Sequence, residues 1–171
     1  WFYQEGCSYI YPDEWEEYIK VIPESEHSNL VKAYYQRLTS KNLGTRIRAA
    51  KAWSNWESRT SKLIQNEKSL HQLTDDKTAE AFARIECHYF INKGFFNTDR
   101  WILDNIDCIK HIPNIIIQGR YDVVCPMRSA WDLHKKWENS NLIIIPNAGH
   151  SMLEEGIQRA LVQYTDKFIN Y

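Results

Sequence analysis

Short apolar runs toward the end of the chain predict two β-strands with a helix between them. Residues 115–117 and 142–145 are rich in β-branched side chains and are bounded by Pro, Gly and Asn, a pattern typical of buried strands in a parallel sheet. Residues 129–137 predict the intervening helix. A strand, a helix and a second strand in this order form a βαβ unit, so both strands should end at the same edge of the sheet.

Apolar positions at helical spacing dominate the chain before residue 109 and recur in its last segment. Helices are predicted over residues 11–19, from residue 28, over 45–58, from Asp75 or Asp76 to Asn92, and over a terminal segment from Glu154 or Gly156 to Ile169. The helix before Asn92 carries an apolar stripe of Phe82, Ile85, Tyr89 and Phe90. The polar stretch 62–73 favours no element. We expect an α/β protein with a mostly helical region over residues 1–108 and a strand-bearing region over 109–171.

Composition and charge exclude several classes of protein. Hydrophobic residues make up 43% of the 171 residues, which excludes a disordered chain. A net charge of −1 offers no electrostatic footprint for nucleic acid or an acidic membrane. No apolar run approaches the roughly 20 residues that span a bilayer, and the first residues have no visible signal peptide.

The cysteines and histidines indicate neither a disulfide framework nor a metal site. Cys7, Cys87, Cys108 and Cys125 are irregularly spaced, which favours free thiols in a reducing compartment. We therefore expect a cytoplasmic protein. The six histidines show no metal-ligand spacing, so we expect neither a metal nor another cofactor.

Asp122 and His150 each follow one of the two predicted strands. An imidazole that takes a proton from a serine needs a carboxylate to fix its tautomer and to stabilise its cationic form. An acid followed by a histidine is also the chain order of the second and third members of an α/β-hydrolase triad. Either residue alone is more often an ordinary turn or surface residue. Their matched positions after consecutive strands favour the triad.

Several stretches resemble the C-terminal part of the proline iminopeptidases (prolyl aminopeptidases), which are serine peptidases with the α/β-hydrolase fold. These stretches are WFYQEG (1–6), AWSNWE (52–57), ARIECHYF (83–90), GRYDVVCP (119–126) and AGHS (148–151). The resemblance spans essentially the whole chain. It implies the last parallel strands and helices of an α/β-hydrolase domain over residues 109–171, preceded by a helical cap region over 1–108.

The resemblance also implies roles for individual residues. Asp122 would be the acid of the triad and His150 its base. Glu57 and Glu86 would lie on cap helices and bind the positively charged amine of a peptide with an N-terminal proline. A secondary ammonium group has two donors, and charge-assisted hydrogen bonds to carboxylates are strong. Phe2 corresponds to a ring of the proline pocket in some relatives.

Two motifs of this family do not occur in the chain. These are the oxyanion loop of the His-Gly-Gly-Pro-Gly type and the nucleophile elbow of the Gly-x-Ser-x-Gly type. The serines nearest to plausible chemistry are Ser54, Ser58, Ser129 and Ser151, and none has the flanking glycines of an elbow. The chain also begins with Trp rather than Met. We interpret it as a fragment whose missing N-terminal half supplies the nucleophile, in cis or in trans.

Two other functions explain part of the pattern. A catalytically inactive remnant or interaction module would explain the missing nucleophile, and its exposed sheet edges would need a partner chain. A different α/β-hydrolase, such as an esterase or epoxide hydrolase, fits Asp122 and His150 equally well. It leaves Glu57 and Glu86 without a role, because neutral substrates need no paired anions. An aminopeptidase that releases N-terminal proline therefore ranks first.

Overall fold

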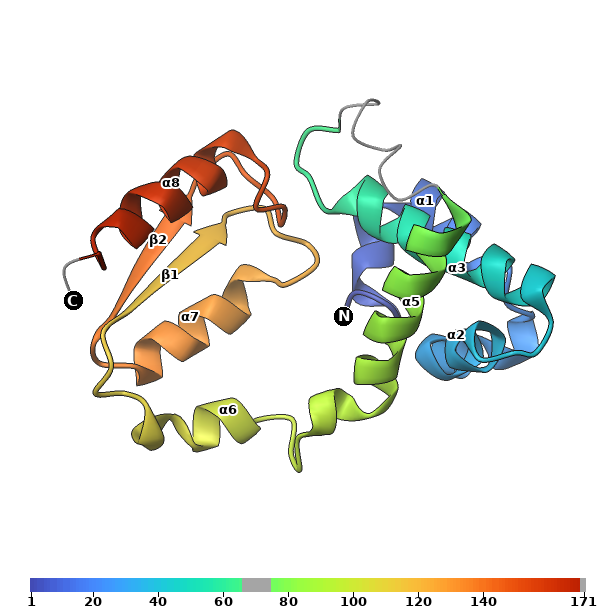
Figure 1. Ribbon diagram of the computed structural model, residues 1–171, viewed down its shortest axis with the longest axis horizontal. Helices are drawn as coiled ribbons and strands as arrows, with labels where there is room; N and C mark the ends of the chain where they lie inside the picture. Colours follow the sequence, from blue (N-terminus) through green and yellow to red (C-terminus); the bar gives the residue numbers. More distant parts are fainter. Residues whose placement is uncertain (66–74, 170–171) are drawn as a thin grey trace. The chain divides into compact units, whose positions relative to one another are not determined.

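The chain divides into two compact units, which we call the helical unit and the strand-bearing unit. The computed structural model describes residues 1–65 and 75–169 (Figure 1). The helical unit comprises Trp1–Thr60 and Ile64–Phe96, and the strand-bearing unit comprises Ser61–Leu63 and Asn97–Tyr171. Part of the stretch 62–73, for which the sequence favoured no element, lies outside the described residues. The limits of a cap region and a hydrolase region at residues 108 and 109 remain a prediction.

Helices and short 3₁₀ turns build the helical unit, and they confirm the four predicted helices with slightly shifted ends. They are η1 (Gly6–Tyr9), α1 (Pro12–Ile19), η2 (Glu24–Asn29), α2 (Leu30–Leu38), α3 (Leu43–Thr60), α5 (Asp76–Ile91) and η4 (Lys93–Phe95). Local chemistry sets their ends. Pro12 occupies the first turn of α1, and the Asn29 side chain accepts a hydrogen bond from the first turn of α2. Asp75, one of the two residues from which the sequence predicts this helix to start, caps α5 by accepting from the amides of Lys77 and Thr78.

Large aromatic side chains fill the core of the helical unit. Trp53 and Trp56 from α3, Tyr18 from α1 and Tyr34 from α2 are fully buried. The Tyr18 ring stacks on that of Tyr34 with a centroid separation of 4.7 Å and on that of Trp56 at 5.5 Å. Burial of such rings is a major source of stability in a small domain. This unit therefore encloses a core of its own.

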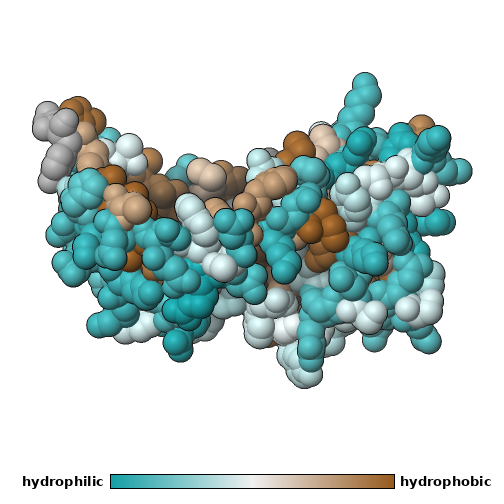
Figure 2. All heavy atoms as spheres, turned by 90° about the horizontal axis from the view of Figure 1, so that it is seen from below, coloured by the Kyte–Doolittle hydropathy of each residue, from teal (hydrophilic) through white to brown (hydrophobic). Residues whose placement is uncertain are grey.

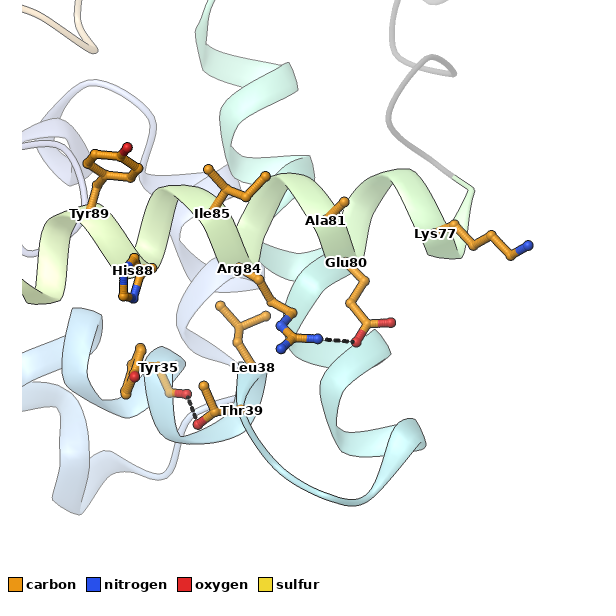
Figure 3. A pocket seen from close by; sticks show the side chains of 10 residues that line it. All are labelled: Tyr35, Leu38, Thr39, Lys77, Glu80, Ala81, Arg84, Ile85, His88 and Tyr89. Carbon is orange, nitrogen blue, oxygen red and sulfur yellow. Dashed lines mark hydrogen bonds and ion pairs between the residues drawn. The ribbon is translucent and has the colours of Figure 1, made fainter.

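Only part of the apolar stripe predicted for α5 faces this core, where the Phe90 ring lies 5.0 Å from that of Tyr3 and 6.3 Å from that of Trp53 between centroids. Ile85 and Tyr89 are 62% and 53% exposed, and both line a groove of about 660 Å³ between α2 and α5 (Figure 3). The buried residues of α5 are instead Ala79, Ala83 and Cys87. The indole rings of α3 already fill the core, so α5 packs against them through its small side chains.

The strand-bearing unit contains the predicted βαβ arrangement. Strands β1 (Asn114–Gly119) and β2 (Ser140–Ile145) are parallel, and Asn114 pairs with Ser140 at the start of the register. The helices and 3₁₀ turn of this unit are α6 (Trp101–Asp104), η5 (Ile106–Cys108), α7 (Met127–Lys136) and α8 (Glu155–Asp166). The two strands lie between α7 and α8 in the view of Figure 1. The terminal helix ends at Asp166, before the predicted end at Ile169.

The strands are less buried than the sequence predicts. Side chains of β1 from Asn114 to Gln118 are only half-buried, as are most of those of β2. The sheet of the described residues has two strands, so little of the chain covers their apolar side chains. Figure 2 shows hydrophobic residues among hydrophilic ones on the face that it views. Within the described residues, every helix is too short or too polar to cross a lipid bilayer.

Candidate active site

Asp122 lies in the turn that follows β1, and its carboxylate is held by several donors. Its Oδ1 accepts hydrogen bonds from the backbone amides of Val124 at 3.0 Å and Cys125 at 2.7 Å. Its Oδ2 accepts a hydrogen bond from Nε2 of Gln118 over 3.1 Å, and Gln118 is the penultimate residue of β1. The Asp122 side chain is only 6% exposed. Donors from the backbone and from Gln118 therefore fix the position of this anion.

His150 lies in the turn that follows β2 and contacts Asp122 directly. Its Nδ1 donates to Oδ2 of Asp122 over 3.0 Å. This hydrogen bond raises the pKa of His150 to about 10, a hydrogen bond with the Cys125 side chain adds to the shift, and burial opposes it. The bond engages Nδ1 and leaves Nε2 as the ring nitrogen that can exchange a proton. The structure thus brings the predicted acid and base together in the geometry that orients an imidazole.

Gly119 allows the two turns to approach each other. The Tyr121 amide donates to the carbonyl of Ala148 over 2.9 Å, which joins the Asp122 turn to the His150 turn. A Cβ atom on Gly119 would lie 1.8 Å from the carbonyl oxygen of Gly149, a distance that no side chain tolerates. Position 119 therefore needs glycine, because there is no room for a Cβ atom between the two turns. The sequence identified the turn but not this requirement.

Glu57 on α3 and Glu86 on α5 converge on one phenol in the helical unit. The Tyr3 hydroxyl donates to Glu57 and lies 2.9 Å from Oε2 of Glu86. Nε1 of Trp53 donates to the same Glu86 oxygen over 2.8 Å. Glu57 is only 6% exposed. Two carboxylates from different helices are thus held within reach of a single hydrogen-bonding group.

Aromatic rings surround this pair of carboxylates. The Tyr3 ring stacks on that of Trp53 with a centroid separation of 4.0 Å, and the Phe2 ring stacks on that of Trp56 at 5.2 Å. Burial, followed by the charges of Glu57 and Glu86, raises the pKa of Tyr3 well above its usual value. The phenol therefore remains a hydrogen-bond donor. Neighbouring anions and ring faces form a setting that suits a cation with an apolar body.

Sequence reasoning missed the part that Tyr3 plays. Tyr3 lies within the stretch WFYQEG, but no local pattern separates it from the other tyrosines of the chain. Its two partners are 54 and 83 residues away, so only the fold reveals the contact. Asp122 and His150 belong to the strand-bearing unit, and Glu57 and Glu86 belong to the helical unit.

The other candidate chemistries gain little support from the described residues. Ser54 is fully buried and donates to the carbonyl of Ala79 over 3.4 Å, which is a structural role within the helical unit. No group of three or more His, Cys, Asp or Glu side chains in the described part of the chain could hold a metal ion.

Comparison with known proteins places the chain in a family. Residues 84–171 match the Abhydrolase_4 family, described as TAP-like protein. The probable proline iminopeptidase of Leptolyngbya boryana is 57% identical over 99% of this chain and 53% of its own length. The proline iminopeptidase of Arabidopsis thaliana is 52% identical over 98% of this chain and 44% of its own length. The proline iminopeptidase of Xylella fastidiosa (strain 9a5c) is 48% identical over 99% of this chain and 54% of its own length.

The fold and the family match define the protein as an α/β-hydrolase. The chain belongs to the TAP-like family, and its relatives confirm the predicted resemblance to the C-terminal part of the proline iminopeptidases. It spans about half the length of the curated relatives that it matches.

Proposed function

We propose that this chain is the C-terminal part of a serine aminopeptidase that releases N-terminal proline from peptides. The observation that carries the proposal is the 3.0 Å hydrogen bond between His150 and Asp122, just past the ends of adjacent parallel strands. The relatives that are named proline iminopeptidase support the choice of substrate. Their greater length supports a nucleophile and an oxyanion loop supplied by a part that this chain does not contain.

In this mechanism His150 is the general base and Asp122 orients it. His150 acts in its neutral form, whose share rises with pH because the pKa of His150 is about 10. Nε2 of the neutral imidazole takes the proton of a serine hydroxyl as the serine oxygen attacks the carbonyl carbon of the proline residue. Asp122 stabilises the imidazolium that forms, and His150 then gives the proton to the departing amine. A water molecule attacks the resulting acyl-enzyme with the help of the same base, which releases proline and restores the serine.

Glu57, Glu86 and Phe2 would bind the substrate's N-terminal residue. The secondary ammonium group of proline donates two hydrogen bonds, and the two carboxylates that meet at Tyr3 supply two acceptors. Phe2, stacked on Trp56, would offer an apolar surface to the pyrrolidine ring. The four free thiols favour a reducing compartment such as the cytoplasm for this enzyme.

The decisive test removes the proposed base in a complete enzyme. We define the complete enzyme as this chain together with an upstream half that carries the nucleophile, either fused or supplied separately. His150→Ala should lower kcat for a proline substrate by about 10⁴-fold or more, because the serine loses its base. The matched control is His111→Ala, since His111 is exposed on the same unit. Substantial turnover in the His150 variant would overturn the assignment.

A second variant tests the binding of the amine. Glu86→Gln removes the negative charge while keeping the size of the side chain, so the preference for a free over an N-acetylated proline should fall. The measurement is the ratio of kcat/KM for the two substrates, with Glu16→Gln on the exposed face of α1 as control. An unchanged ratio in the Glu86 variant would show that the amine is bound elsewhere.

The half-exposed strands favour a second candidate, an inactive module that needs a partner chain. The apolar residues of β1 and β2 leave much surface for another polypeptide to cover. Mixing the chain with a separately expressed upstream half separates the two functions. Recovered release of proline supports the peptidase, whereas a stable complex without turnover supports the module.

A further inference from the structure

Glu154 precedes α8, but its side chain does not cap that helix. No hydrogen bond from its carboxylate to the first turn of α8 is present. Instead Oε1 accepts the amide of Gly149 over 2.9 Å, and Oε2 accepts the amide of Leu63 over 3.3 Å. Leu63 is 91 residues away in the sequence. One carboxylate therefore joins the His150 turn to a distant segment of the same unit.

Residues Ser61–Leu63, which we call the 61–63 segment, also contact the turn through the backbone. The carbonyl of Ser61 accepts the amides of both His150 and Ser151, each over 2.9 Å. A Cβ atom on Gly149 would lie 2.9 Å from the Leu63 nitrogen, so the two backbones are in close contact. The 61–63 segment belongs to the strand-bearing unit, although it follows α3 directly in the chain.

These contacts fix the backbone on both sides of His150. Three consecutive amides, those of Gly149, His150 and Ser151, are bound by only two acceptor groups, the Glu154 carboxylate and the Ser61 carbonyl. Hydrogen bonds to an ionised carboxylate are stronger than those to a neutral acceptor. The imidazole of His150 is held by Asp122, whereas the backbone that carries it is held by Glu154 and Ser61.

We propose that Glu154 is a positioning residue for His150. By holding Gly149 and Leu63 together, it sets the place of the His150 backbone and so the alignment of the imidazole with Asp122. The proposal rests on the proposed function only in so far as His150 is the base. A displacement of about 1 Å in a reacting group can lower a rate by about 10²-fold. A contact that fixes the backbone of His150 can therefore affect the rate of the reaction.

The test compares Glu154→Gln and Glu154→Ala in the complete enzyme. The glutamine keeps one acceptor oxygen and loses the charge, whereas the alanine loses both contacts. We expect kcat to fall by about 10-fold for glutamine and about 100-fold for alanine, with KM within about twofold of the original value. Glu155→Gln is the matched control, because the neighbouring Glu155 side chain is 83% exposed and pairs with Arg159. It should leave both constants unchanged.

A readout independent of turnover is the NMR titration of His150. If Glu154 aligns the imidazole with Asp122, both Glu154 variants should lower the pKa of His150 from about 10 toward 6.5, and the Gly149 amide should exchange faster. A purely structural role would lower the melting temperature and leave this titration unchanged. That outcome would overturn the proposal, as would unchanged kcat in both variants. The isosteric glutamine variant decides the matter if the alanine variant does not fold.

The failure of the proposed function would look different. If His150→Ala retains full turnover, His150 is not the base, and the NMR titration still reports whether Glu154 controls its alignment. If His150→Ala is inactive while both Glu154 variants behave like Glu155→Gln, the peptidase assignment stands and the positioning role is wrong.

Discussion

The two units hold their charged side chains in different ways. In the helical unit, Glu86 is bound by two aromatic side chains, Tyr3 and Trp53, within a core of fully buried rings. In the strand-bearing unit, Asp122 is bound by two backbone amides and by the side chains of Gln118 and His150. The buried apolar residues described in that unit are few and mostly small, namely Ile106, Ala130, Ala148, Ile157 and Ala160.

This difference indicates where each site is vulnerable. The carboxylate pair depends on the packing of large rings, so the loss of core volume should disturb it. The Asp122–His150 pair depends on the path of two turns, so a change in the spacing of their backbones should disturb it. The helical unit also encloses its own core, whereas the strands of the other unit need further cover.

The largest expected effect is the loss of a core ring from the helical unit. Trp53→Ala should lower the free energy of unfolding by about 3–5 kcal/mol, because a fully buried indole leaves a large cavity. Trp131→Ala, on the strand-bearing unit, removes an indole that is 46% exposed and should change it by less than about 1 kcal/mol. Urea unfolding followed by circular dichroism measures both. Equal losses would remove the contrast between the units.

The sequence predicts much of the strand-bearing unit because its signals are local. Apolar β-branched runs followed by turns identify β1 and β2, and the matched positions of Asp122 and His150 follow from the parallel order of the strands. The cap of α5 at Asp75 is equally local. These features depend on neighbours within a few residues, where propensity and turn chemistry act directly.

The parts that the sequence could not predict depend on distant contacts. The sequence places Ile85 and Tyr89 in the apolar stripe of α5, yet both side chains are exposed, and the helix buries Ala79, Ala83 and Cys87 instead. Tyr3 and Glu154 carry common polar groups. The partners of Tyr3 lie 54 and 83 residues away, and one partner of Glu154 lies 91 residues away. The spacing of apolar residues identifies the most apolar face of a helix. In a close-packed core, the space left by neighbouring side chains decides which face is buried.

A smaller effect is expected from added volume between the two turns. Gly119→Ala should destabilise the strand-bearing unit by about 1–3 kcal/mol, because its methyl group would meet the Gly149 carbonyl at 1.8 Å. It should also disturb the hydrogen bond from His150 to Asp122. Gly44→Ala, on α3, is the matched control, since its nearest atom would be 3.4 Å away. Alanine favours helices, so this control should stabilise by up to about 1 kcal/mol. The same sign for both variants in urea unfolding would contradict the spacing argument.

The smallest expected effect is a difference between the two units in how their stability depends on pH. The pKa of His150 is raised from 6.5 to about 10, so the folded state binds more protons than the unfolded state between these values. The stability that the Asp122 pair contributes is therefore fully present below pH 6.5 and is lost as pH rises through about 10. Burial raises the pKa of the Cys7 and Cys87 thiols in the helical unit from 9.0 to about 12. These thiols therefore lower the free energy of unfolding only as pH rises from 9.0 to about 12.

Comparing the original chain with His150→Gln isolates the lower window, because both proteins share the two thiols. The difference in unfolding free energy should be at most about 1 kcal/mol, since the imidazole is 38% exposed and water screens the pair. It should be largest below pH 6.5 and vanish above pH 10. A difference that grows with pH would mean that folding favours the neutral imidazole. The turns after β1 and β2 would then not hold His150 against Asp122 as a hydrogen-bonded ion pair.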